Sequence, residues 1–444
     1  MKQRTTALLL AVALALSLLG AGALAVEGGV FPASGEQAAE TAPAGERAPE
    51  APEESGVLSQ ARPVDPEEDG GIPVEEYRPD PVGTISFANL SSRMRENSYS
   101  LLSLEENIAV IESLDYDEMT EEIRKAINQT ADAQWGMITS IPFGMGSMMA
   151  ASLDATYDSL RETFDDLKKG KLQEDNAAIV RQLRNAQDQV VMMGETLYIT
   201  LAGLELNDSS LDRSLAALDR TIRELELRYE LGHISSLTLQ TTRGGRTSLV
   251  SGQQTLEMNI QNLKLQLELM IGAELTGEIK LQPLPQVTQA QLNGMDLEAD
   301  LAAAKEISYQ LFAAQRTLDD AKKAFKDNNK GKQYKRDQAQ HTLNAAQYTY
   351  ETTVQNFEMS FRTLYAQVKD CKQVLDAART ALAVEQSNYA AARLKQSQGT
   401  LSLNGLLEAE DKLNESKEKV ASAENDLFSA YNTYRWAVDY GILN

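Results

Sequence analysis

The residue types that usually carry chemistry are scarce in this chain and poorly spaced. It has two histidines, His233 and His341, more than 100 residues apart, and one cysteine, Cys371. A structural zinc site needs several Cys or His ligands, and a Ser-His-Asp triad needs a histidine beside its partners. Adjacent acids such as Glu105 and Glu106 point about 100° apart on a helix, so they make a poor acid–base pair. We therefore expect no enzyme activity, no cofactor and no metal site.

These residues have plainer interpretations. We expect Cys371 to be a small, buried, apolar side chain on a long helix. His233 fits either a polar residue in a turn or a contact with a partner that responds to pH. Two glycines, Gly244 and Gly245, follow soon after it and weaken any helix there. They indicate either a delayed helix start or a kink that lets the turn region move.

The composition favours helices and argues against nucleic-acid binding. Of the 444 residues, 42% are hydrophobic but only 6% are aromatic. Ala, Leu, Val, Ile and Met therefore supply most of the apolar content, which favours helix over sheet. The net charge of -23 leaves no basic stripe of the kind that nucleic acid requires.

The first 25 residues predict a signal peptide for export. Lysine and arginine precede an apolar run at 7–19, which is short for a membrane span, and an A-x-A cleavage site follows at 23–25. Residues 26–83 are acidic and contain most of the prolines of the chain. Such a segment cannot bury enough apolar surface to fold, so we expect a disordered acidic linker.

The rest of the chain is poor in proline and predicts long helices, among them 337–398 and 402–440. In the last helix, large residues recur every seven positions, and smaller ones follow three positions after each. The large set is Leu406, Leu413, Val420, Leu427 and Tyr434, and the small set is Ala409, Ser416, Ala423, Ala430 and Ala437. A seven-residue repeat of this kind predicts a left-handed coiled coil whose helices approach closely.

Two short patterns occur twice in the same order. Residues 96–101 and 306–311 share E-x-S-Y-x-L at an offset of 210, and residues 232–235 and 399–402 share G-x-[IL]-S at an offset of 167. We therefore expect two tandem repeats, 84–282 and 296–444. The segment 283–295 should be an extended connector, because Pro283 and Pro285 forbid a continuous helix there.

The two offsets differ, so the first repeat carries extra chain between its two patterns. This chain includes an uncharged segment near 136–150 with three glycines, where the second repeat has a short polar turn. One hypothesis is a helical hairpin that packs on itself. The other is a contact with a membrane or another envelope partner, made by Ile138, Ile141, Phe143 and Met145, because flexible methionines suit an adaptable contact.

The order of these motifs, given twice, resembles the TolC-type outer-membrane efflux protein family. Each repeat opens with E-x-S-Y-x-L, continues as a long helix, turns at G-x-x-S and ends in a heptad helix at a glycine, Gly272 or Gly441. The resemblance spans 84–444. It implies an all-α fold of long antiparallel helical hairpins and coiled coils from two tandem repeats, assembled as a homotrimer around a hollow helical barrel.

The resemblance also implies where partners bind. The two G-x-x-S turns would be helix-turn-helix tips that meet a membrane-fusion adaptor of the HlyD type and, through it, an inner-membrane transporter. The tip residues are Gly232, Ile234, Ser235, Gly399, Leu401 and Ser402. A glycine can end one helix with a positive φ, and a serine three residues later is a good N-cap for the next.

The sequence departs from this family where the membrane barrel would lie. A barrel strand needs about ten residues of alternating pattern, and neither repeat offers them. We therefore expect a variant whose transmembrane β-barrel strands are reduced or absent. It would be exported to the cell envelope, to an outer membrane if the host has one and otherwise to a cell-wall-associated position.

The function that these expectations favour is a trimeric, non-enzymatic conduit or docking component of an efflux or secretion assembly. Two other hypotheses stay open. One is a coiled-coil spacer or scaffold of the cell envelope without a pore, and the other is a helical binding or regulatory module. A pore requires a continuous inner face of small and polar residues, whereas a solid spacer requires every heptad seam to be buried.

Overall fold

The protein is described by a computed structural model that covers residues 80–140, 145–328 and 332–443, with only the backbone given for 145–152. The predicted signal peptide and nearly all of the predicted linker lie outside these residues. The fold below is that of the compact unit Pro73–Asn444.

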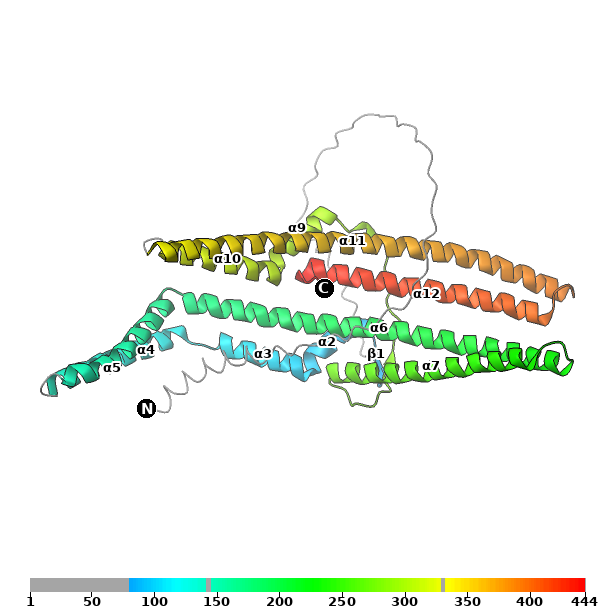
Figure 1. Ribbon diagram of the computed structural model, residues 1–444, viewed down its shortest axis with the longest axis horizontal. Coiled ribbons are helices and arrows are strands. Elements are labelled where there is room, and N and C mark those ends of the chain that lie inside the picture. Colours follow the sequence, from blue (N-terminus) through cyan, green and yellow to red (C-terminus); the bar gives the residue numbers. More distant parts are fainter. Residues whose placement is uncertain (1–79, 141–144, 329–331, 444) are drawn as a thin grey trace, which may run out of the picture. The chain divides into compact units, whose positions relative to one another are not determined.

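The described residues are almost all helical (Figure 1). The first half contains β1 (Thr84–Ile85), α2 (Phe87–Asn97), α3 (Tyr99–Glu112), α4 (Tyr116–Ser140), α5 (Met145–Lys168), α6 (Lys171–Glu230) and α7 (Ser236–Met270). The second half contains β2 (Lys280–Leu281), α8 (Gln289–Asn293), α9 (Leu297–Ile307), α10 (Tyr309–Asn328), α11 (Gln333–Ser397) and α12 (Leu403–Tyr440). The predicted all-α class is confirmed, and the only strands among the described residues are these two short ones. None of the described helices combines the length and the apolar character needed to cross a membrane.

Two long antiparallel hairpins dominate the fold, α6 with α7 and α11 with α12 (Figure 1). The long helices run close to their predicted bounds, because no proline interrupts them. The small residues of the heptad in α12 are buried at Ser416, Ala423, Ala430 and Ala437. The predicted seam therefore faces the core, where small side chains let neighbouring helices approach closely.

The helices pack side by side in the order α7, α6, α12, α11, and α10 lies along α11. The inner pair, α6 and α12, joins the first half of the chain to the second. The carboxylate of Glu195 on α6 lies at this junction and is only 3% exposed. It accepts hydrogen bonds from Trp436 Nε1 at 2.7 Å and Asn432 Nδ2 at 2.9 Å, and Arg435 lies 3.5 Å away. A buried carboxylate is tolerated only with partners of this kind.

The two short strands pair in parallel, Thr84 with Lys280 and Ile85 with Leu281. Tyr198 of α6 fixes this pair, because its buried hydroxyl lies 2.6 Å from the carbonyl oxygen of Gln282 and 3.1 Å from that of Ile85. Burial raises the pKa of the Tyr198 hydroxyl well above its usual range. The start of the first half is thereby tied to the chain that leaves α7.

One part of the predicted connector differs from expectation. Residues 283–295 contain the short helix α8, which follows the prolines. Thr288 Oγ1 accepts from the backbone N–H of Gln291, and the Gln291 side chain accepts from the backbone N–H of Thr288 at 2.8 Å. This capping box starts a helix as soon as the prolines have been passed. The prolines exclude helix only up to that point.

The loop between α7 and β2 wraps around a second buried carboxylate, Glu268, which is 2% exposed. It accepts hydrogen bonds from the backbone N–H groups of Thr276 and Gly277, both at 2.7 Å, and of Ile279 at 3.2 Å. Burial by itself would raise the pKa of Glu268, but the hydrogen bonds from Gly277, Thr276 and Ile279 outweigh it and hold the pKa below its usual value.

We expect Glu268→Gln to lower the unfolding free energy at pH 7 by about 1–3 kcal/mol, because hydrogen bonds to a charged acceptor are lost in a buried place. A lowered folded-state pKa contributes stability above the unfolded value near 4.5, and that stability disappears as the pH falls through the folded value. The gap between wild type and variant in urea unfolding should therefore shrink below about pH 4.5. The exposed Glu274→Gln serves as the control, and a gap independent of pH would contradict the assignment.

Candidate functional site: the two hairpin tips

The first long hairpin turns at Gly232, just after the end of α6. Gly232 has a φ of 74°, in the left-handed region. Its N–H donates to the carbonyl of Tyr229 at 2.9 Å, and the N–H of His233 donates to the carbonyl of Arg228 at 2.8 Å. These two bonds form a Schellman motif, which ends a helix by satisfying its last carbonyls.

The second long hairpin turns in the same way at Gly399. Its φ is also 74°. Gly399 N–H donates to the carbonyl of Gln396 at 2.9 Å, and Thr400 N–H donates to that of Lys395 at 2.9 Å. The two turns therefore share one hydrogen-bond pattern although their flanking residues differ.

A serine starts the returning helix at each turn. Ser235 Oγ accepts from the backbone N–H of Thr238 at 3.2 Å, and Ser402 Oγ accepts from that of Gly405 at 3.1 Å. The local geometry expected of both glycines and both serines is observed. Ile234 and Leu401, between glycine and serine, are half-buried. The role of these residues in docking stays a prediction.

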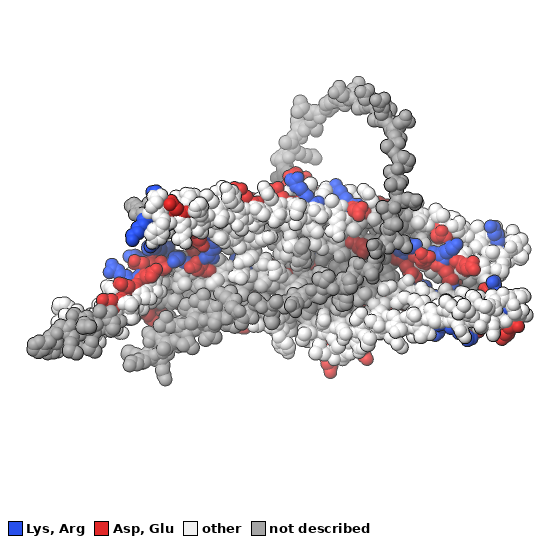
Figure 2. Space-filling model, in the orientation of Figure 1, with Lys and Arg blue, Asp and Glu red and all other residues white. Residues whose placement is uncertain are grey.

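The two tips lie at the same end of this unit (Figure 1). Near the tips, Asn404 at the start of α12 donates to Glu224 at the end of α6, at 3.2 Å. Ion pairs continue along the same helices, from Arg220 to Asp411 and from Arg213 to Glu418. In Figure 2, acidic and basic side chains lie side by side along this seam towards the tips.

Exposed apolar side chains surround both turns, a feature that the motif analysis did not single out. We call this set the tip surface: Leu227, Tyr229, Leu231, Leu237, Leu394 and Leu403. Leu231 is 61% exposed and Leu237 70%, and across the seam Leu394 is 59% and Leu403 62% exposed. Grouped exposed leucines at the end of a hairpin are typical of a contact surface. The sequence feature that could have indicated this surface is a leucine near the end of the helix before each glycine, with another just after each serine.

Other residues near the tips have simpler roles. His233 is exposed within the first turn. Gly244 and Gly245 lie inside α7, which begins at Ser236, so the hypothesis of a delayed helix start is wrong. A Cβ atom added at either glycine would meet no atom within 4 Å.

The residues predicted to contact an envelope partner are not part of the tips. Ile138 lies on α4, 48% exposed, and Met145 is the first residue of α5. The side chain of Met145 and the whole of Ile141 and Phe143 lie outside the described residues. The helices on either side of 141–144, α4 and α5, pack against each other and precede the start of α6, at the other end of that helix from Gly232.

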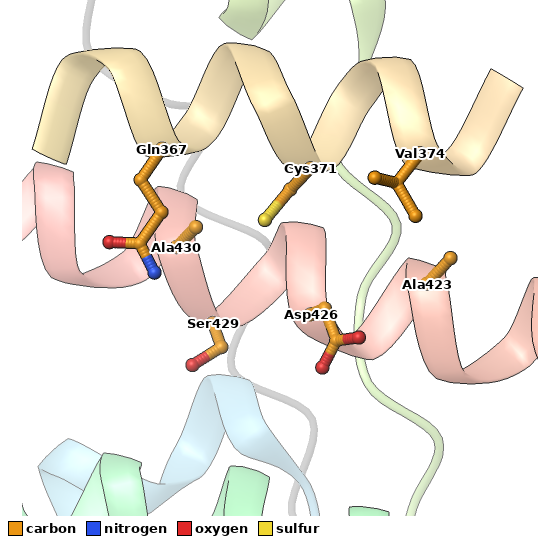
Figure 3. Close-up of a pocket in the computed structure, with 7 residues that line it drawn as sticks. All are labelled: Gln367, Cys371, Val374, Ala423, Asp426, Ser429 and Ala430. Atoms are coloured by element: carbon orange, nitrogen blue, oxygen red, sulfur yellow. The ribbon is translucent and has the colours of Figure 1, made fainter. Parts of the chain in front are cut away.

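Cys371 borders a hollow of about 260 Å³ between α11 and α12 (Figure 3). The hollow is lined by Gln367, Cys371, Val374, Ala423, Asp426, Ser429 and Ala430. The thiol is half-buried rather than fully buried as predicted. Burial raises its pKa, and the nearby Asp426 and Asp370 raise it further. Within the described ranges, no cluster of three or more His, Cys, Asp or Glu side chains could hold a metal ion.

No family model and no curated protein matches the chain. Among solved structures, it is similar to the outer membrane protein VceC of Vibrio cholerae, at 13% identity and a TM-score of 0.46, over 79% of this chain and 95% of that one. It is also similar to the outer membrane channel CmeC of Campylobacter jejuni, at 16% and 0.40, over 64% and 67% of the two chains. A third is the open state of the outer membrane channel MtrE of Neisseria gonorrhoeae, at 14% and 0.39, over 80% and 88%.

The glycines of the first hairpin should respond to substitution in opposite directions. Gly232→Ala forces alanine into the left-handed region and should cost about 1–2 kcal/mol. Gly244→Ala places a better helix former in an open helical position and should add up to about 1 kcal/mol. Thermal or urea unfolding of both variants measures this. Shifts in the same direction would contradict the assigned backbone geometry, and Gly399→Ala should behave like Gly232→Ala.

Proposed function

We propose that this protein is a non-enzymatic conduit component of an efflux or secretion assembly in the cell envelope. Three copies stand side by side in a ring of helices and dock by their tips on a membrane-fusion adaptor of the HlyD type, which connects them to an inner-membrane transporter. One observation carries the proposal. The seam inside the chain is closed by contacts between buried and half-buried side chains, whereas corresponding positions on its two outer edges carry exposed large apolar side chains.

The contacts between the two halves of one chain indicate which positions would touch between neighbouring copies. On α6, Arg181 stacks over the ring of Phe312 of α10, with its guanidinium carbon 4.2 Å from the ring centroid. Further along α6, Met192 is only 4% exposed. Trp436 of α12, 2% exposed, donates to Glu195 in the same seam.

The repeat offsets carry these positions to the outer edges. The offset of 167 carries Arg181 to Tyr348 and Met192 to Met359, both on α11, where they are 67% and 63% exposed. On the other edge, Leu102 of α3 is equivalent to Phe312 at the offset of 210, and it is 40% exposed. Leu269 of α7 is equivalent to Trp436 at the offset of 167, and it is 60% exposed. Each outer edge thus has exposed apolar side chains at the positions whose equivalents make contacts in the seam.

Charge supports the same arrangement. The seam ion pairs Arg213–Glu418 and Arg220–Asp411 correspond, at the offset of 167, to uncharged residues on the edges: Thr380, Ser251, Ser387 and Gly244. Edge-to-edge packing therefore leaves no unpaired charge at these places, and the small side chains allow a close approach.

An edge of α11 that packs on the α3–α7 edge of another copy makes a head-to-tail contact, and such contacts produce rings when the rotation closes. The number three follows from the family resemblance. A ring places all tip surfaces on one rim, where six exposed turns can receive the helical hairpins of an adaptor. Its helices surround a central space, which is what a conduit needs.

Cysteine trapping tests the edge contact. In a Cys371→Ser background, Tyr348→Cys and Leu102→Cys are purified separately, mixed and oxidised. We expect disulfide-linked dimers only in the mixture, because the two sites meet across copies. Val374→Cys is the control, since it lies on the same helix about 39 Å further along and should not link to Leu102→Cys. No dimers, or equal yields with the control, would contradict the edge pairing.

Two matched substitutions separate docking from assembly. Leu231→Asp with Leu394→Asp should weaken binding of a purified adaptor hairpin at least about tenfold, because buried apolar anchors dominate such contacts. The oligomer mass should not change. Leu269→Asp should lower the oligomer mass in light scattering, because it places a charge on the edge, and should leave the tips unchanged. Unchanged adaptor binding by the Leu231→Asp, Leu394→Asp variant would show that the tips are not the docking site.

A further inference from the structure

We propose that the second tip recognises its partner through two basic side chains, Arg393 and Lys395, and that this partner is a helical hairpin with carboxylates beside an apolar residue at its turn. The inference rests on the proposed function, because it names the chemistry of the protein that docks on the tips. It does not depend on how many copies form the ring.

The two tips differ in charge although they share one backbone geometry. Residues 386–407, which lead into and out of the second turn, contain Arg393 and Lys395 and no acidic residue. The equivalent residues 219–240 of the first hairpin contain four acidic and three basic side chains. The second tip is therefore a positive site in a chain whose net charge is -23.

The first tip neutralises its own arginines. Arg228 pairs with Glu224 one turn earlier in α6, and two further carboxylates of α6 meet arginines of α7. These two pairs are Glu226 with Arg243 and Asp219 with Arg246, both at 2.5 Å. Because each of these arginines already meets a carboxylate, the first tip offers a partner little free positive charge.

Lys395 lacks the carboxylate that its counterpart has. At the offset of 167, Lys395 is equivalent to Arg228, and Ala391 occupies the place of Glu224. An acidic residue four positions before a basic one stabilises it on a helix surface. This pairing is lost in the second tip, and Lys395 is exposed.

Arg393 is free for a different reason. It occupies the place of Glu226, and Glu410 occupies that of Arg243, so the charges are exchanged between the two helices. Among the ion pairs of the described residues, none joins Arg393 to Glu410 or to another acid. The exposed guanidinium is therefore available to a partner.

The apolar part of the second tip is smaller than that of the first and lies between the two cations. Polar residues replace two exposed leucines of the first tip: Gln398 for Leu231 and Asn404 for Leu237. Leu394 remains, 59% exposed. Since neighbouring positions on a helix diverge by about 100°, Arg393 and Lys395 flank this leucine on its two sides.

This arrangement fits a protein partner better than a membrane. Anionic lipid surfaces are bound by clusters of about four to eight basic residues, and the second tip has two. An apolar anchor with charges at its rim is typical of a protein interface, where the rim charges determine specificity and the rate of association. An adaptor hairpin can supply the matching leucine and carboxylates at its turn.

The test uses the full mature chain and three synthetic helical hairpins as probes. The probes are identical except at the two positions beside a leucine in the turn, which hold glutamate, glutamine or lysine. We expect the glutamate probe to bind about threefold to tenfold more tightly than the glutamine probe, as two exposed ion pairs allow. The lysine probe should bind most weakly, and high salt should remove these differences.

A charge exchange on the protein provides the second measurement. Arg393→Glu with Lys395→Glu should reverse the order and favour the lysine probe, with helicity by circular dichroism retained. The matched control replaces Arg228 and Glu224 together by alanine. It removes a pair from the first tip without a change in net charge, so the preference for glutamate should persist.

The outcomes separate this inference from the proposed function. Equal binding of the glutamate and glutamine probes, or an unchanged order in the charge-exchanged variant, overturns the inference and leaves docking on the leucines intact. Absence of binding by every probe overturns the inference together with docking at the tips. Ring formation is judged separately, by the trapping of Tyr348→Cys with Leu102→Cys.

Discussion

The buried carboxylate of Glu195 determines how the two halves of the chain meet. Removal of water from a charge is costly, and here Trp436, Asn432 and Arg435 offset that cost. Since all three are on α12, they fix its register against α6. A shift of one helical turn would break all three of these contacts. This register brings both tips to one end and leaves α7 and α11 on the outside.

The parts of the fold that depend on neighbouring residues could be predicted from the sequence. The turns at Gly232 and Gly399 are examples, because a glycine and a serine three residues later specify them locally. The E-x-S-Y pattern is another: Ser98 and Ser308 are both buried, and each ends a helix, α2 and α9. The matching geometry agrees with an internal duplication, whose boundaries stay predictions.

The parts that depend on distant residues could not be predicted. Glu195 and its partner Trp436 are 241 positions apart, and nothing near either residue indicates the other. The tip surface was also missed, since a leucine on a helix can face either a partner helix or solvent, and the residues next to Leu237 do not decide between the two. The helix α8 was missed as well, although its capping box of Thr288 and Gln291 is a local signal that lies close to the prolines.

A conduit and a solid spacer differ most directly in what the assembled copies enclose. Single-particle imaging of the purified mature protein, viewed along the helices, tests this difference most directly. The account predicts particles of three copies around a central opening, with α11 of one copy against α7 of the next. Monomers at micromolar concentration, or bundles with a closed centre, would contradict it.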